Sequence, residues 1–252
     1  LYRKGLGHRY GRSMQSIAGL HFNFSMSDSF WLSLQQREKN TQNLSDYKSE
    51  KYFHIIRNFQ RYRWVLMYFF GASNIVHESF VEGKKHNLEK LGRDTYYSSE
   101  ALSLRMGGLG YTSSAQEKIQ ICFNQVDSYI KTLENARLEP YQAYEKIGIE
   151  KNGELIQLNT HLLQIDNEFY STIRPKNIAK SKESALKALH SRGIEYIEIR
   201  LCDINPFSPY GISTEQVDFM HLFLLWCLEQ ESPVLCDKAC AEVENNFNLV
   251  TN

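Results

Sequence analysis

The sequence predicts an α+β fold built around a largely antiparallel sheet. Two segments alternate apolar and polar residues with a period of two, which is typical of half-buried strands. Long segments with apolar residues at helical spacing lie among them, and the two kinds of segment do not follow a regular β-α-β order. The 252 residues contain no repeat and no Pro-, Gly- or Ser-rich linker, so we expect a single domain over residues 1–252.

The first predicted strand has one apolar and one polar face. Its residues divide into Leu20, Phe22, Phe24 and Met26 on one side and His21, Asn23 and Ser25 on the other. We expect a helix after Asp28 and a second one over residues 45–70. The second helix should have its N-cap at Ser45 or Asp46 and should end at Gly71.

The later elements are predicted from shorter signals. Residues 71–114 are rich in loop-forming residues, and a helix is expected over residues 125–138. Short strands are predicted over residues 155–158 and 193–201, and helices over residues 214–228 and 236–248.

The charge and cysteine content argue against several classes of protein. Lys plus Arg and Asp plus Glu both number 29, so the net charge is zero, which argues against binding to nucleic acid or to an anionic membrane surface. The longest segments without a charged residue or His, 64–76 and 222–228, are shorter than the ~20 residues that span a bilayer. Five cysteines without a C-x-x-C motif favour reduced thiols and a cytoplasmic location.

The strand over residues 193–201 carries the most informative polar residues. Alternation places Glu198 and Arg200 side by side on one face of this strand. A carboxylate beside a guanidinium can hold a divalent cation and a phosphate next to each other. The alternative is an ion pair within the strand on a solvated face, and the spacing by itself leaves both interpretations open.

His21 raises the same question on the earlier strand. It shares the polar face with Asn23, and a lone His is more often a hydrogen-bonded structural residue than a metal ligand. If both polar strand faces line one cavity, His21 and Glu198 can share a metal ion. The sequence alone does not show whether they meet.

Two glycine-rich segments are candidate binding loops. Residues 5–11 look like a stretched dinucleotide fingerprint, but a preceding strand is missing and the last spacing is wrong. Residues 105–111 combine Arg105 and Tyr111 with three glycines, which suits the capture of a small carboxylate. An ordinary turn with an exposed Arg is the alternative.

Five segments, in order, resemble sequence blocks of bacterial glutamate–cysteine ligase (γ-glutamylcysteine synthetase), and together they extend over almost the whole chain. They are YRKGLGHRYGRSMQSIAGLHFNFS (2–25), FFGAS (69–73), SLRMGGLGYT (103–112), YSTIRPK (170–176) and RGIEYIEIRLCDINPFSP (192–209). The resemblance implies a curved, mostly antiparallel sheet flanked by helices, in a fold related to glutamine synthetase. It also implies a ligase of glutathione biosynthesis that joins L-glutamate to L-cysteine with ATP as co-substrate, through a γ-glutamyl phosphate.

The resemblance also assigns individual roles. His21 and Glu198 resemble ligands of magnesium, for which manganese is an alternative. Arg200 resembles the arginine that faces the phosphoryl group, and Arg3 the arginine near the reacting centre. The cysteine pocket is represented by Tyr2, Ile17, Arg105, Tyr111 and Tyr170.

The chain differs from the family in length. Family members are about twice as long, and their acidic metal-binding cluster precedes residue 2. We therefore interpret the chain as the central portion of the ligase catalytic domain, inactive alone, and expect the protein to be a monomer. Two alternatives are a related carboxylate–amine ligase with another amine acceptor, and a non-catalytic binding or regulatory chain on the same scaffold.

Overall fold

The computed structural model describes residues 1–110, 113, 115–116 and 119–252. The N-terminal part contains α1 (Tyr2–Tyr10), η1 (Ser13–Ser16), β1 (Leu20–Phe24), α2 (Asp28–Arg37) and α3 (Leu44–Phe70). The next part contains β2 (Ile75–His77), α4 (Glu78–Val81), β3 (Glu89–Leu91) and β4 (Thr95–Tyr97). Then follow α5 (Val126–Leu138), α6 (Gln142–Ile147), β5 (Glu150–Lys151), β6 (Glu154–Leu155), η3 (Asp166–Glu168) and β7 (Ile173–Lys176). The last elements are α7 (Ala185–Arg192), β8 (Tyr196–Cys202), α8 (Thr214–Glu229) and α9 (Asp237–Thr251).

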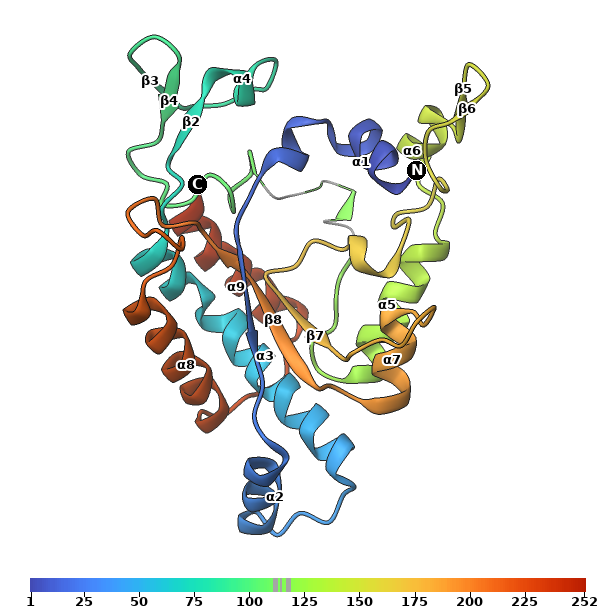
Figure 1. The fold of residues 1–252 in the computed structure, drawn as a ribbon, viewed down its shortest axis with the longest axis vertical. Coiled ribbons are helices and arrows are strands. Elements are labelled where there is room, and N and C mark those ends of the chain that lie inside the picture. Colours follow the sequence, from blue (N-terminus) through green and yellow to red (C-terminus); the bar gives the residue numbers. More distant parts are fainter. Residues whose placement is uncertain (111–112, 114, 117–118) are drawn as a thin grey trace.

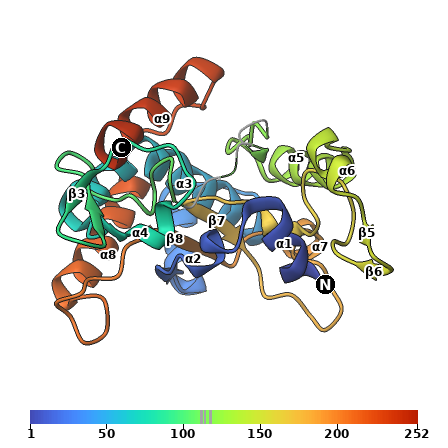
Figure 2. The ribbon, with the colours of Figure 1, turned by 90° about the horizontal axis from the view of Figure 1, so that it is seen from above.

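The central sheet has the strand order β1-β8-β7, and both pairs are antiparallel. Antiparallel pairing of all three strands, with helices packed around them, confirms the predicted α+β class with an antiparallel sheet. In both views of the ribbon, α8 and α9 lie on one side of the central sheet, and α5, α6 and α7 lie on the other (Figures 1 and 2).

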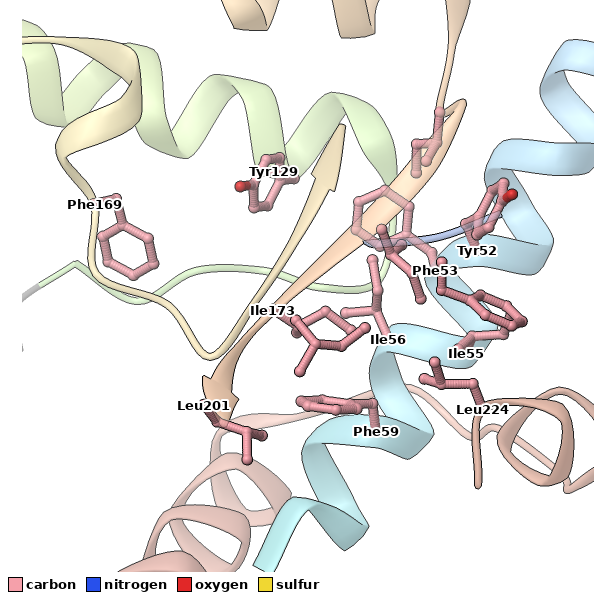
Figure 3. Close-up of a cluster of buried hydrophobic side chains, with 14 of the residues drawn as sticks. Tyr52, Phe53, Ile55, Ile56, Phe59, Tyr129, Phe169, Ile173, Leu201 and Leu224 are labelled. Carbon is pink, nitrogen blue, oxygen red and sulfur yellow. The ribbon is translucent and has the colours of Figure 1, made fainter. Parts of the chain in front are cut away.

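The apolar face of the central sheet packs on α3. Ile197, Ile199 and Leu201 of β8 are completely buried, as are Ile56 and Phe59 of α3. Figure 3 shows the α3 side chains directed toward Ile173 of β7, Leu201 of β8 and Leu224 of α8. Burying each such side chain stabilises the fold by about 1.5–3 kcal/mol. This packing fixes the opposite, polar face of the sheet in place.

The N-terminus of α3 differs from the prediction. The helix begins at Leu44, and Asn43 is its N-cap, because the side-chain oxygen of Asn43 accepts a hydrogen bond from the Asp46 amide at 2.9 Å. The predicted caps Ser45 and Asp46 are therefore wrong. The Ser45 hydroxyl instead donates to the Arg192 carbonyl at 2.8 Å. The predicted end is confirmed, since α3 stops at Phe70 and Gly71 caps it.

Several elements were not predicted. Residues 71–114, expected to be loops, contain a small sheet with the order β2-β4-β3, whose strands are short and exposed or half-buried. The helix α1 was missed because two of its nine residues are glycines, which disfavour helix. The strand β7 has four residues and includes Pro175, so its alternation is too brief to stand out.

Within the described residues, no helix combines the length and the apolar character that crossing a bilayer requires.

Candidate active site

The polar face of the central sheet gathers charged side chains from all of its strands. Across the antiparallel pairs, Glu198 of β8 lies opposite Asn23 of β1 and opposite Arg174 of β7. Residues paired in this way point to the same face. The face is lined by His21, Asn23, Arg174, Lys176, Glu198 and Arg200.

His21 and Glu198 meet on this face. The Nδ1 atom of His21 lies 3.5 Å from Oε1 of Glu198, and Arg200 Nη1 lies 3.5 Å from Oε2 of the same carboxylate. The side chain of His21 is 47% exposed, whereas those of Glu198 and Arg200 are 14% and 15% exposed. The cluster therefore has an open imidazole side and a mostly covered carboxylate–guanidinium pair.

The local field is positive. Burial and then the nearby Arg200 guanidinium lower the pKa of His21, and Glu198 opposes this shift. Burial lowers the pKa of Lys176, and Arg174 lowers it further, with Glu198 again acting in the other direction. A neutral imidazole offers a lone pair to a metal ion. The surrounding guanidinium groups favour an anion such as a phosphate.

Arg105 is anchored to the end of β8. Its guanidinium donates hydrogen bonds to the Arg200 carbonyl at 2.7 Å and to the Leu201 carbonyl at 2.9 Å, and forms an ion pair with Asp203 at 3.2 Å. The side chain is 9% exposed. A Cβ on Gly19 would lie 2.0 Å from Nη2 of Arg105, so the guanidinium fits because residue 19 has no side chain.

Asp203, which is not among the predicted site residues, is a structural partner of Arg105. It is 1% exposed, and its second carboxylate oxygen accepts hydrogen bonds from the Ala72 amide at 3.0 Å and the Ser73 hydroxyl at 2.8 Å. It thus joins the segment after α3 to the end of β8. The sequence signal available for Asp203 was an acidic residue directly after a buried strand.

The other predicted site residues lie on two segments outside β1 and β8. Tyr2 and Arg3 begin α1, with Tyr2 partly buried and Arg3 exposed, and Ile17 is partly buried at the end of η1. Tyr170 precedes β7, and its amide donates to the side-chain oxygen of Gln116 at 2.7 Å. Tyr111 lies outside the described residues. The roles of these residues as a substrate pocket stay predictions.

Arg174 and Lys176 are further charged residues of the polar face. Arg174 is 5% exposed, and its guanidinium donates to the Phe169 carbonyl. The alternation of Ile173 and Pro175 with Arg174 and Lys176 was the available signal for their placement. Four residues give only two repeats of this pattern, which are too few to predict a strand.

The donor set fits a divalent cation in part. His21 and Glu198 provide an imidazole nitrogen and a carboxylate oxygen next to each other. Among the described residues, no group of three or more His, Cys, Asp or Glu side chains is placed to hold a metal ion. Magnesium takes six ligands and keeps several waters, so these two residues would supply a minority of its shell, beside water and phosphate oxygens.

Comparisons with known proteins identify the family. The chain matches the family model of glutamate-cysteine ligase over residues 1–250. It is 50% identical over 247 residues to the glutamate–cysteine ligase of Hahella chejuensis, covering 98% of this chain and 47% of that protein. For the enzyme of Saccharophagus degradans the identity is 52% over 252 residues, covering 99% of this chain and 48% of the relative.

A solved structure shares the fold. The glutamate–cysteine ligase of Francisella tularensis, crystallised in complex with AMP, superposes with a TM-score of 0.89 at 38% identity, covering 98% of this chain and 48% of that one. The chain thus spans about half the length of the relatives that it matches. The match over residues 1–250 and the shared arrangement of an antiparallel sheet flanked by helices show that this chain belongs to the glutamate–cysteine ligase family.

Proposed function

We propose that the complete protein containing this chain joins the γ-carboxylate of L-glutamate to the amine of L-cysteine at the expense of ATP, as the first step of glutathione biosynthesis. The observation that carries the proposal is the cluster of His21, Glu198 and Arg200 on the polar face of the sheet. Membership in the glutamate–cysteine ligase family supports the reaction, and the AMP complex of the Francisella tularensis relative supports a nucleotide substrate.

In this proposal, His21 and Glu198 contribute ligands to a magnesium ion, with manganese as an alternative. When bound, the cation neutralises the charge on the transferring phosphoryl oxygens. The Glu198 carboxylate lies 3.5 Å from the Arg200 guanidinium, so it can bind the cation while Arg200 is directed toward the same face. The two groups therefore hold a cation and an anion side by side.

Arg200 and Arg3 are proposed to act on the reacting groups. A γ-carboxylate oxygen of glutamate attacks the γ-phosphorus of ATP, and ADP leaves. The cysteine amine then attacks the acyl carbon of the γ-glutamyl phosphate, and inorganic phosphate leaves as the amine loses a proton. Arg200 would stabilise the charge on the transferring phosphoryl group, and Arg3, which is exposed on α1, would stabilise the tetrahedral centre.

The acceptor pocket is proposed to be formed by Tyr2, Ile17, Arg105, Tyr111 and Tyr170. In the structure Arg105 uses three hydrogen-bonding contacts to hold the end of β8. Contact with the cysteine carboxylate would therefore require part of its guanidinium to exchange a protein partner for the substrate. The cytoplasmic location and the monomeric state stay predictions.

The test is cysteine-dependent ADP release by the complete protein, with glutamate, magnesium and ATP present. We expect release that disappears without cysteine and collapses in Glu198→Gln. ADP release that does not depend on cysteine but depends on another amine would show that the acceptor is that amine, with the same phosphoryl-transfer reaction. A folded full-length protein that releases no ADP under any of these conditions would favour a binding or regulatory chain.

A further inference from the structure

A buried ionic cluster joins α1 to the segment that precedes β7. The side chains of Arg9 and Glu168 are both fully buried, and Arg9 Nη1 lies 3.4 Å from Oε1 of Glu168. The Tyr10 hydroxyl donates to the same carboxylate oxygen at 2.7 Å. The other carboxylate oxygen accepts a hydrogen bond from the backbone N–H of Gln164. None of these residues belongs to the polar face of the sheet.

Arg9 fixes α1 against the segment that precedes β7. Its guanidinium donates to the Gln157 side chain at 2.8 Å, to the His161 carbonyl at 3.0 Å and to the Asn159 carbonyl at 2.5 Å. It also lies 4.3 Å from the centre of the Tyr144 ring. A fully buried cation is tolerated only when its donors are satisfied in this way, so a shift of α1 against residues 157–168 would break several contacts together.

Gln116 extends the cluster to Tyr170. The Gln116 amide nitrogen donates to the Tyr10 hydroxyl at 3.2 Å and to the Glu168 carbonyl at 3.3 Å. Its amide oxygen accepts the Tyr170 backbone N–H at 2.7 Å. The ring of Tyr10 meets the ring of Tyr170 edge-on, with centroids 5.6 Å apart. Both the backbone and the ring of Tyr170 are therefore held by groups that are fixed on Glu168.

We propose that Tyr10 and Gln116 are positioning residues that fix Tyr170 for the amine acceptor and tie it to α1, the helix that carries Tyr2 and Arg3. The proposal rests on the proposed function, in which Tyr170 lines the cysteine pocket. Tyr2 and Arg3 on α1 and Tyr170 before β7, which lie far apart in the sequence, are thereby held in fixed relative positions. Loss of these contacts raises the concentration of cysteine needed for saturation and leaves the phosphoryl-transfer face of the sheet unchanged.

The first test is Tyr10→Phe in the complete protein. This change keeps the ring against Tyr170 and removes the hydroxyl that links Glu168 to Gln116. We expect the KM for cysteine to rise about tenfold, the KM values for ATP and glutamate to stay within about twofold, and kcat to change by less than about threefold. A fold-wide defect would not produce such a split, because it would lower the active fraction for all substrates alike.

Tyr47→Phe is the matched control. Tyr47 is 1% exposed, and its hydroxyl donates to a Glu38 carboxylate oxygen at 3.0 Å, so it is also a buried tyrosine bonded to a glutamate. It lies on α3, and its partner Glu38 is the C-cap of α2, outside the proposed site. This variant should leave the KM for cysteine at the wild-type value.

Gln116→Glu provides the second, independent variant. Its carboxylate can still accept the Tyr170 N–H but can no longer donate to Tyr10 and the Glu168 carbonyl. We expect the KM for cysteine to rise in the same way, and the double variant with Tyr10→Phe to rise less than the product of the single effects, because both remove one shared hydrogen bond.

The outcomes separate the two proposals. A wild-type protein without cysteine-dependent ADP release overturns the proposed function itself. An active wild-type protein whose folded Tyr10→Phe variant saturates normally with cysteine overturns the positioning role. If Tyr10→Phe does not fold, normal cysteine saturation of Gln116→Glu overturns it instead.

Discussion

The Nδ1 atom of His21 lies 3.5 Å from Oε1 of Glu198, which places an imidazole and a carboxylate from the two paired strands β1 and β8 on one open face. The apolar face of β8 is buried against α3, and Phe22 and Phe24 of β1 lie against His221 of α8, so this juxtaposition is held by the core of the molecule. A rigid sheet is a suitable support for a site whose groups must hold a cation and a phosphate at fixed positions.

Glu198→Gln removes the carboxylate charge of this pair. We expect a higher magnesium concentration for half-saturation and a fall in kcat of roughly 100-fold, the scale of losing one electrostatic stabiliser of the transferring charge. The amide has nearly the same shape, so the melting temperature should change little. Magnesium titration of ADP release by the complete protein measures the effect. Glu195→Gln, which affects an exposed partner of Lys48 next to the same strand, is the control. An unchanged magnesium dependence in Glu198→Gln would show that Glu198 is not a ligand of the metal ion.

Arg105→Ala should have two effects. It leaves the buried Asp203 carboxylate without its ion-pair partner, which should cost about 3–5 kcal/mol of the free energy of unfolding. It should also raise the KM for cysteine. Asp203→Asn separates the two effects, because it weakens the ion pair and keeps the guanidinium. Chemical denaturation and cysteine saturation curves measure them. Normal cysteine saturation in a folded Arg105→Ala protein would refute the pocket assignment.

Gly19→Ala tests the close fit around Arg105. The added Cβ would lie 2.0 Å from Nη2 of a guanidinium that is already held by the end of β8. We expect a loss of about 1–3 kcal/mol in the free energy of unfolding, as for other overpacked sites. Gly7→Ala is the comparison, because a Cβ there would approach Gln15 Nε2 at 3.2 Å within α1, where Ala is preferred over Gly. Equal stability of the two variants in a denaturant titration would contradict the geometry at residue 19.

The pair of Glu183 and Arg192 predicts a contribution to acid stability. Hydrogen bonds from Arg192 lower the pKa of Glu183 to about 2. Because the folded-state pKa lies below the unfolded value of about 4.3, the ionised carboxylate stabilises the folded state above that value. The contribution is lost as the pH falls toward 2. Melting temperatures of the wild type and Glu183→Gln should therefore differ at pH 6 and converge between about pH 4 and pH 2. A constant difference over that range would show that the carboxylate charge is not responsible.

The strands β1 and β8 and the helices α3 and α8 could be predicted because each has a long, regular alternation or helical spacing of apolar residues. The helix α1 could not, because its glycines disfavour helix and its stability comes from packing, as shown by the close approach of Gly5 to Gln164. The N-cap of α3 was misplaced because Asn43, Ser45 and Asp46 are all good capping residues. The Ser45 hydroxyl instead donates a hydrogen bond to the carbonyl of Arg192, which lies far away in the sequence.

The candidate site also contains features that the sequence predicts and features that depend on tertiary structure. Alternation alone put His21 on the polar face of one strand and Glu198 with Arg200 on the polar face of another, because side chains in a strand point to opposite sides at every step. Their meeting depended on the antiparallel register of β1 and β8, which is selected because the apolar side chains of both strands face the helices. The anchoring of Arg105 on Asp203 and of Tyr170 on Gln116 and Tyr10 was likewise decided by tertiary structure. Such contacts join residues whose local sequence carries no information about their partner.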